Sequence, residues 1–253
     1  MNSGRRLNMA TTTQSIRYLQ RRQTAPGLER RLLAWVGLAV MLGAPCARAF
    51  QEEHPISGRR IAGVMGVGGA DWLERHERDI EEHPEQALDA LGLKPGMLVA
   101  DVGAGTGYMS LRMARRVAPG GKVYASDIQP EMLRLLRRNM EKAKITNVET
   151  VLGTETDPKL PGGLDLILLV DVYHEFSQPQ QMLRKMRDAL KPDGRLVLLE
   201  YRKEDPAIPI RPEHKMSVQE VKLELGAEGF EMSQAIETLP RQHIFVMTKK
   251  RVD

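Results

Sequence analysis

The chain has 253 residues, 42% of them apolar, which suffices for one substantial hydrophobic core and is too little for two full-sized domains. Its net charge of +4 is uneven: residues 1–49 carry eight arginines against the single acid Glu29, a balance of +7 that leaves −3 on residues 50–253. This mildly acidic remainder excludes an electrostatic argument for a nucleic-acid partner.

Residues 1–49 have the three parts of a secretory signal: an arginine-rich start, an uncharged apolar run over 32–44, and a small-x-small end at 47–49. We expect cleavage before Phe50 and an exported protein, periplasmic or extracellular. The run of about 13 residues is shorter than the roughly 20 that cross a bilayer as a helix, so no stable membrane span is expected once the leader is removed. A membrane-tethered protein, or a cytoplasmic one whose true start lies at Met9 or later, is the alternative.

Residues 50–84 predict a lead-in and a helix. Glycines gather over 63–69 with no strand before them, which favours a flexible lead-in over a phosphate-binding loop. Residues 71–83 are dense in charge around Trp72, which indicates a largely solvated helix. The only cysteine, Cys46, lies in the leader, so the mature chain is expected to form no disulfide and no thiolate metal site.

A regular alternation of strands and helices occupies the predicted domain of residues 85–253. Strands are expected over 98–102, 122–126, 148–152, 164–170 and 196–200, a turn over 192–194, and two final extended stretches over 235–239 and 243–248. Amphipathic helices are expected from Pro84, over 107–117, from Pro130, around 182–190, and from Ser217, which forms a capping box with Glu220. This order predicts a doubly wound α/β fold: a mostly parallel seven-stranded Rossmann-like sheet with a C-terminal antiparallel strand pair.

The first strand ends in a glycine-rich turn, Asp101-Val102-Gly103-Ala104-Gly105-Thr106-Gly107-Tyr108. Glycines there permit positive φ and let a ligand approach the backbone, and the following helix offers free N–H groups. A dinucleotide fingerprint requires glycine where Tyr108 stands, which disfavours an NAD-dependent dehydrogenase. Asp101 adds a carboxylate suited to a cationic ligand.

The second strand ends at Asp127, about 20 residues after Gly107, where a carboxylate can accept the hydroxyls of a ribose. The alternative is an acid placed at a helix N-terminus, because Pro130 and Glu131 follow.

These residues resemble class I S-adenosylmethionine-dependent methyltransferases over about 85–248. The resemblance implies S-adenosylmethionine as cofactor, with the loop of Gly103, Ala104, Gly105, Gly107 and Tyr108 along its methionine and ribose parts, Asp127 and Ile128 at the ribose, and Thr154 and Glu155 near the adenine. The segment Val170–Phe176, which includes Asp171, matches the motif after the fourth strand, and Leu190–Leu196 resembles the helix-turn-strand that follows. The narrower likeness is to methyltransferases of quinones and other metabolites, which implies a small-molecule acceptor.

His174 follows the fourth strand and is the candidate general base, because its ordinary pKa of about 6.5 lets it accept a proton near neutrality. The alternative is that it only packs beside Tyr173 and Phe176. Glu200, Tyr201 and His214 could line an acceptor pocket or belong to the surface. Asp171 with Glu200 hints at a metal-dependent site, but no third ligand is visible, so no metal is expected. A non-catalytic S-adenosylmethionine-binding or sensor protein is the competing function.

Overall fold

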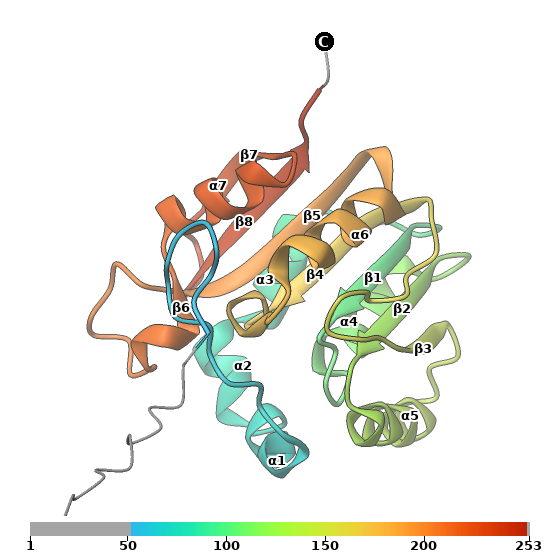
Figure 1. The fold of residues 1–253 in the computed structure, drawn as a ribbon. Coiled ribbons are helices and arrows are strands. Elements are labelled where there is room, and N and C mark those ends of the chain that lie inside the picture. The colour runs from blue at the N-terminus through green and yellow to red at the C-terminus, as the bar shows by residue number, and fades with distance from the viewer. Residues whose placement is uncertain (1–51, 252–253) are drawn as a thin grey trace, which may run out of the picture. The chain divides into compact units, whose positions relative to one another are not determined.

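The computed structural model describes residues 52–251, so the leader, Cys46 and the cleavage site before Phe50 lie outside the described residues. An eight-stranded sheet forms the centre of the molecule, in the order β3-β2-β1-β4-β5-β8-β7, with β6 paired to β5 (Figure 1). The strands are β1 (Leu98–Val102), β2 (Lys122–Asp127), β3 (Val148–Leu152), β4 (Leu164–Val170), β5 (Leu190–Arg202), β6 (Lys215–Met216), β7 (Phe230–Ile236) and β8 (Gln242–Lys249).

Strands β3, β2, β1, β4 and β5 run parallel, β8 pairs antiparallel with β5, and β7 pairs antiparallel with β8. The predicted doubly wound sheet with a C-terminal antiparallel pair is thus confirmed, and the two-residue β6 is the one strand beyond the seven expected. The chain leaves the sheet in opposite directions from β1 and β4, which makes this point the switch in strand order where such folds bind ligands.

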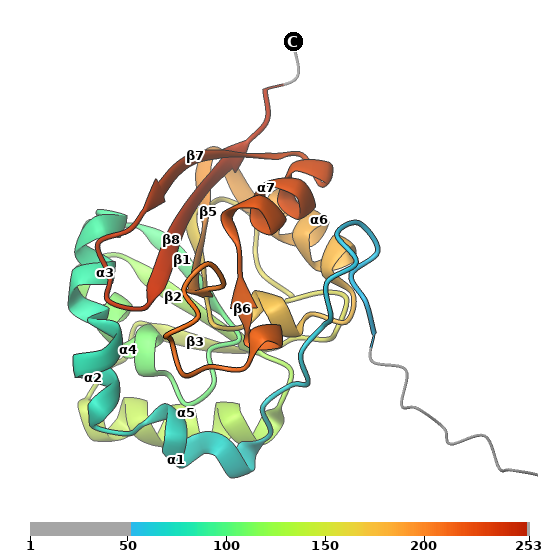
Figure 2. The same cartoon turned by 90° about the vertical axis from the view of Figure 1, so that its left-hand side faces the viewer.

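Helices cover both faces of the sheet (Figures 1 and 2). One face packs on α3 (Pro84–Leu91), α4 (Tyr108–Val117) and α5 (Pro130–Ala143), and the other on α6 (Pro179–Ala189) and α7 (Val218–Ala227). Alternate residues of the strands serve the two cores, as Val99 and Ala100 of β1 do. Ser217 caps α7 in the predicted capping box with Glu220. No helix within residues 52–251 is long and apolar enough to cross a membrane.

Two strands, β5 and β7, differ from the sequence prediction by more than one residue at their ends. The turn expected over 192–194 is a bulge within β5: Leu190 already pairs with Leu164, and Arg195 pairs with Leu166, so the intervening residues loop out while the strand continues. Strand β7 begins at Phe230, five residues earlier than expected. It lies at the edge of the sheet, and its polar residues Glu231, Ser233 and Gln234 interrupt the apolar ones, which hid the strand from a search for apolar runs.

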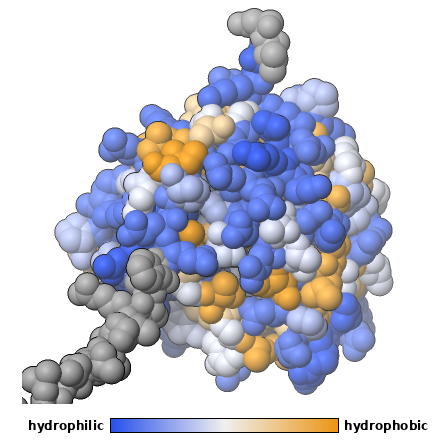
Figure 3. Space-filling model, viewed as in Figure 1, coloured by the Kyte–Doolittle hydropathy of each residue, from blue (hydrophilic) through white to orange (hydrophobic). Residues whose placement is uncertain are grey.

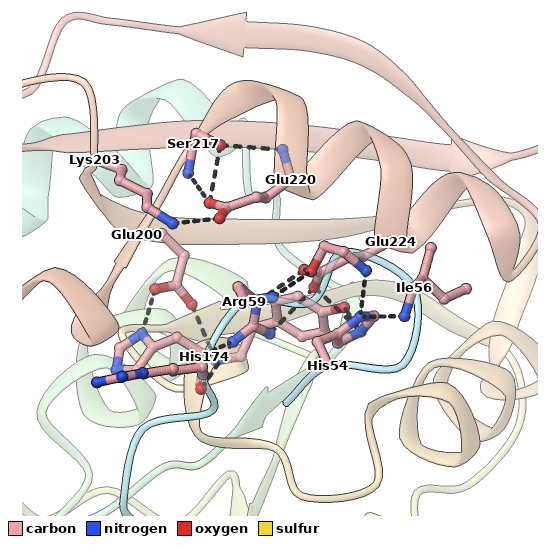
Figure 4. A network of polar contacts seen from close by, with 12 residues as sticks. His54, Ile56, Arg59, His174, Glu200, Lys203, Ser217, Glu220 and Glu224 are labelled. Carbon is pink, nitrogen blue, oxygen red and sulfur yellow. Dashed lines mark hydrogen bonds and ion pairs between the residues drawn. The ribbon is translucent and has the colours of Figure 1, made fainter. Parts of the chain in front are cut away.

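The sequence predicts a flexible N-terminal lead-in, whereas the structure shows it docked on α7 and on the 3-10 helix η2 (Tyr173–Glu175). Arg59 is buried and pairs with the fully buried Glu224 of α7, Nε to Oε1 at 2.8 Å, and donates from Nη1 to the carbonyl of His174 at 3.1 Å (Figure 4). Ala62 donates its N–H to the same carbonyl at 3.0 Å. A segment remote in sequence therefore supports the residue predicted as catalytic.

The expected solvated helix over 71–83 is instead two short helices, α1 (Ala70–Leu73) and α2 (Glu77–Glu82), and the 3-10 helix η1 (Val67–Gly69) precedes them. Two of its charged side chains, Arg78 and Glu82, are buried and form an ion pair of 2.7 Å. Because that pair satisfies both charges internally, charge density was a poor guide to exposure here.

Candidate active site

The glycine loop between β1 and α4 has the conformation that its sequence predicts. Gly103, Gly105 and Gly107 have φ of +73°, +53° and +92°, where other residues are strained. A Cβ on Gly103 would lie 2.4 Å from Val172 Cγ2, and one on Gly107 would lie 2.8 Å from Leu136 Cγ. The loop therefore requires glycine both for its dihedral angles and for its packing.

Asp127 at the end of β2 ties this loop to the start of α5. Its Oδ2 accepts the N–H of Gly105 at 2.8 Å, and its Oδ1 accepts the N–H of Gln129 at 2.9 Å. Burial raises the pKa of this carboxyl and the backbone bonds oppose the shift. Each oxygen keeps a lone pair, and the residue lines a cavity together with Ile128.

That cavity, of about 400 Å³, lies at the switch in strand order and extends from the glycine loop to η2 and to the 3-10 helix η3 (Pro212–His214). Eight of the predicted site residues line it: Gly103, Gly105, Asp127, Ile128, Thr154, Glu155, Asp171 and His174. Apolar residues line it as well, among them Val64, Met65, Trp72, Leu73, Phe176 and Ile210. The face in Figure 3 is largely hydrophilic, with one apolar patch at its upper left and further apolar surface in its lower part.

Four predicted cofactor residues lie outside the lining of this cavity: Asp101, Ala104, Gly107 and Tyr108. Asp101 is buried and accepts the hydroxyl of Ser110 at 2.5 Å, and burial raises its pKa to about 6. The ring of Tyr108 lies 4.0 Å from the guanidinium of Arg78 and 4.0 Å from that of Arg112. In this structure both residues hold the loop and helix in place.

Asp171 lines the cavity at the end of β4 with a strained backbone, φ +50°. Its Oδ2 accepts Gln242 Nε2 at 2.7 Å, whereas its buried Oδ1 has no hydrogen-bond partner within residues 52–251. Burial, and then repulsion from Glu82 and Glu200, hold the pKa of Asp171 well above its usual range. Arg78 lines the same part of the cavity and was missed by sequence reasoning, because only the fold brings α2 here.

His174 on η2 is 2% exposed and carries a carboxylate partner (Figure 4). Its Nδ1 lies 2.6 Å from Oε2 of Glu200, which is fully buried on β5 and also accepts the N–H of Tyr173 at 3.0 Å. Burial by itself lowers the pKa of His174, but the charge and hydrogen bond of Glu200 outweigh it and the pKa is raised. Glu200 therefore lies behind the cavity wall, whereas Tyr201 and His214 line the cavity.

A second imidazole meets His174 at the cavity wall. His214 Nδ1 lies 3.2 Å from His174 Nε2, and His214 Nε2 lies 2.9 Å from Nη2 of Arg211. Glu175 completes a cluster in which His174, Glu175 and His214 each bring one potential metal-ligand atom within 4.8 Å of the others. Burial raises the pKa of Glu175 to about 7. This cluster contains neither Asp171 nor Glu200, the pair that the sequence suggested, and no sequence signal points to it because η2 and η3 are about 40 residues apart.

Comparisons with known proteins agree with this geometry. A family profile described as a methyltransferase domain matches residues 93–244. The crystal structure of an S-adenosylmethionine-dependent methyltransferase from Aquifex aeolicus superposes with a TM-score of 0.69 at 29% identity, covering 73% of this chain and 98% of that one.

Two curated relatives match in sequence over part of their length. A protein-L-isoaspartate O-methyltransferase of Methanothrix thermoacetophila is 34% identical over 113 residues, 44% of this chain and 50% of that protein. The ubiquinone/menaquinone biosynthesis C-methyltransferase UbiE of Hahella chejuensis is 32% identical over 125 residues, 49% of each. The chain thus spans about half the length of the curated relatives it matches. From the matched domain, the fold and the glycine loop together, the chain belongs to the class I S-adenosylmethionine-dependent methyltransferases.

Proposed function

We propose that the protein transfers a methyl group from S-adenosylmethionine to a small-molecule acceptor. The observation that carries this proposal is the single cavity lined at one end by Gly103, Gly105 and Asp127 and at the other by His174 and His214. Donor and acceptor sites of a methyl-transfer enzyme must share one enclosed space, because alignment of the two reactants supplies most of the catalysis.

The residues at the donor end fit the parts of S-adenosylmethionine. Asp127 has free lone pairs for the ribose hydroxyls, and Thr154 and Glu155 stand beyond it for the adenine. The unpartnered Oδ1 of Asp171 is an acceptor for the ammonium of the methionine part, and Arg78 is the nearby cation for its carboxylate. When bound, the donor supplies a methyl group that is already electrophilic on a sulfonium sulfur.

The acceptor end combines apolar walls with a proton-accepting group. Trp72, Phe176 and Ile210 provide surface for an apolar molecule, and the cavity is too small for a folded partner. The relative UbiE is named for ubiquinone and menaquinone biosynthesis, which supports a small, largely apolar acceptor here. We assign the proton-accepting role to the paired imidazoles of His174, which Glu200 orients, and His214.

Calorimetry with S-adenosylmethionine and with NAD tests the donor assignment. We expect micromolar affinity for the former and none for the latter, whereas tighter binding of NAD would contradict the proposal. Turnover against a panel of hydroxylated and quinol-type metabolites, with S-adenosylhomocysteine as the measured product, then tests catalysis. A protein that binds the donor tightly and turns over with no member of the panel would favour the sensor function instead.

A further inference from the structure

Three polar contacts run in series from the protein surface to the core beside the proposed acceptor site. Arg211 Nη2 lies 2.9 Å from His214 Nε2, His214 Nδ1 lies 3.2 Å from His174 Nε2, and His174 Nδ1 lies 2.6 Å from Glu200 Oε2. The two imidazole rings meet edge to face, with centroids 5.0 Å apart.

The guanidinium at one end of this series decides where the protons lie. A guanidinium only donates, so His214 Nε2 is an acceptor, and a neutral His214 carries its hydrogen on Nδ1. That hydrogen points to His174 Nε2, which must then be the acceptor, so His174 carries its own hydrogen on Nδ1 and donates it to Glu200. One assignment satisfies all three contacts.

Access separates the roles of the two imidazoles. His174 is 2% exposed, and both of its nitrogens are already bonded within the protein. His214 is only partly buried, lines the cavity, and has Nε2 bonded to Arg211, whose side chain is 75% exposed and pairs with Glu213 Oε1 at 3.6 Å. An acceptor in the cavity therefore meets His214 Nε2 before any nitrogen of His174.

We infer that His214 is the catalytic base that contacts the acceptor and that His174 receives the relayed proton, an inference that rests on the proposed function. The acceptor O–H bond breaks and its proton binds His214 Nε2, while the Nδ1 proton of His214 moves to His174 Nε2. The imidazolium of His174 is held through Nδ1–H by the Glu200 carboxylate. The freed oxygen lone pair forms the new bond to the methyl carbon, and the electron pair of the broken carbon–sulfur bond stays on sulfur, giving the neutral thioether.

The charged surroundings favour this direction of proton movement. The charged and titratable groups around His214 are His174 and Glu175 of η2, Glu213 of η3, Arg211 just before η3, and Glu200 of β5. Burial, then His174 and Arg211, lower the pKa of His214, whereas Glu200 raises that of His174. Arg211 also lies where it can stabilise an oxyanion, so the geometry fits an acceptor that must lose a hydroxyl proton.

The cluster of His174, Glu175 and His214 is also a candidate metal site, but the contact between Arg211 and His214 disfavours a bound metal. A cation on His214 Nδ1 would require the lone pair there and the hydrogen on Nε2, so that an N–H would face the guanidinium at 2.9 Å. The series of hydrogen bonds already uses every imidazole nitrogen without a metal.

Histidine NMR tests the relay without any acceptor. In protein labelled with ¹⁵N in its histidine rings, we expect His174 and His214 both to carry their hydrogen on Nδ1 near pH 8. A proton on Nε2 of His214 would overturn the inference. The visible absorption of added Co²⁺ tests the metal alternative: binding of one Co²⁺ per chain that is lost in His214→Ala would also overturn the inference.

The second test measures the kinetics of methyl transfer to the acceptor that the metabolite panel identifies. His214→Asn keeps a donor in place of Nδ1–H but has no second nitrogen to accept a proton, so we expect its kcat to fall at least about 10²-fold, as in His214→Ala. Donor affinity should be unchanged in both, and His76→Asn, at an exposed histidine, is the matched control. A kcat of His214→Asn within about 3-fold of the parent would overturn the inference, whereas a parent that binds no donor would overturn the proposed function instead.

Discussion

At the scale of single residues, Asp127 combines a structural role with a position on the cavity wall. Its carboxylate faces the cavity, yet it also accepts the N–H groups of Gly105 and Gln129, and so links the glycine loop to α5. The ribose and helix-terminus interpretations of this residue are therefore compatible, since its four lone-pair positions exceed its two protein bonds.

The change Asp127→Ala separates these tasks. We expect donor affinity to fall by about 1.5–3 kcal/mol, the scale of a hydrogen bond to a charged group. Stability without ligand should also fall, because two buried N–H groups lose their acceptor. Calorimetry with S-adenosylmethionine and thermal unfolding measure the two effects. Asp127→Asn is the control, because it retains one acceptor oxygen. If Asp127→Ala loses stability but keeps donor affinity, the result would contradict a ribose contact.

The pH dependence of methyl transfer should report His174. Because Glu200 raises the pKa of His174 above its ordinary value of about 6.5, the unprotonated form that accepts a proton is lost at a higher pH than for a free histidine. We therefore expect kcat to fall as the pH drops from about 8 toward 6, and His174→Ala to lower kcat by roughly 10²-fold with donor affinity nearly unchanged.

The change Glu200→Gln tests whether Glu200 sets the pH dependence by raising the pKa of His174. Burial lowers the pKa of His174, and Glu200 raises it more than Glu175 and Asp171 do, so without the Glu200 charge the fall in kcat should shift to lower pH. A pH profile identical to that of the parent would show that His174 is not the titrating group.

At the scale of elements, the docked segment of residues 52–62 supports the catalytic histidine from outside the sheet. Its Arg59 bridges Glu224 of α7 and the carbonyl of His174, and His54 Nε2 lies 3.2 Å from the same glutamate (Figure 4). These charges are buried, so each depends on its partner far more than an exposed ion pair does.

Arg59→Ala should therefore destabilise the protein by about 3–5 kcal/mol, because it leaves the charge of Glu224 buried with one cation fewer. Denaturant unfolding measures this change. Arg60→Ala, at the neighbouring exposed arginine, is the matched control and should change stability by less than about 0.5 kcal/mol. Equal effects of the two variants would contradict a structural role for the buried pair.

At the scale of the whole molecule, the leader prediction concerns where the enzyme works. The arginine-rich start and the small-x-small end at residues 47–49 predict a mature N-terminus at or near Phe50. N-terminal sequencing of protein from its native host checks this. A soluble cytoplasmic fraction with residue 1 intact would contradict export and would place the enzyme beside the cytoplasmic supply of its donor.

The sequence by itself determined the fold class, the parallel strands and the glycine loop, because these follow from local rules: apolar runs of strand length, helical periodicity and positive φ at glycine. It also named Asp127, which ends the second strand, and Asp171 and His174, which lie in the segment after the fourth strand. Only the tertiary structure decided that Arg78, Glu175 and Arg211 join them, and that Asp101 and Tyr108 instead hold the scaffold. Crossovers and docked segments bring distant parts of the chain together at this site, and no local sequence pattern encodes contacts that form only when the chain folds.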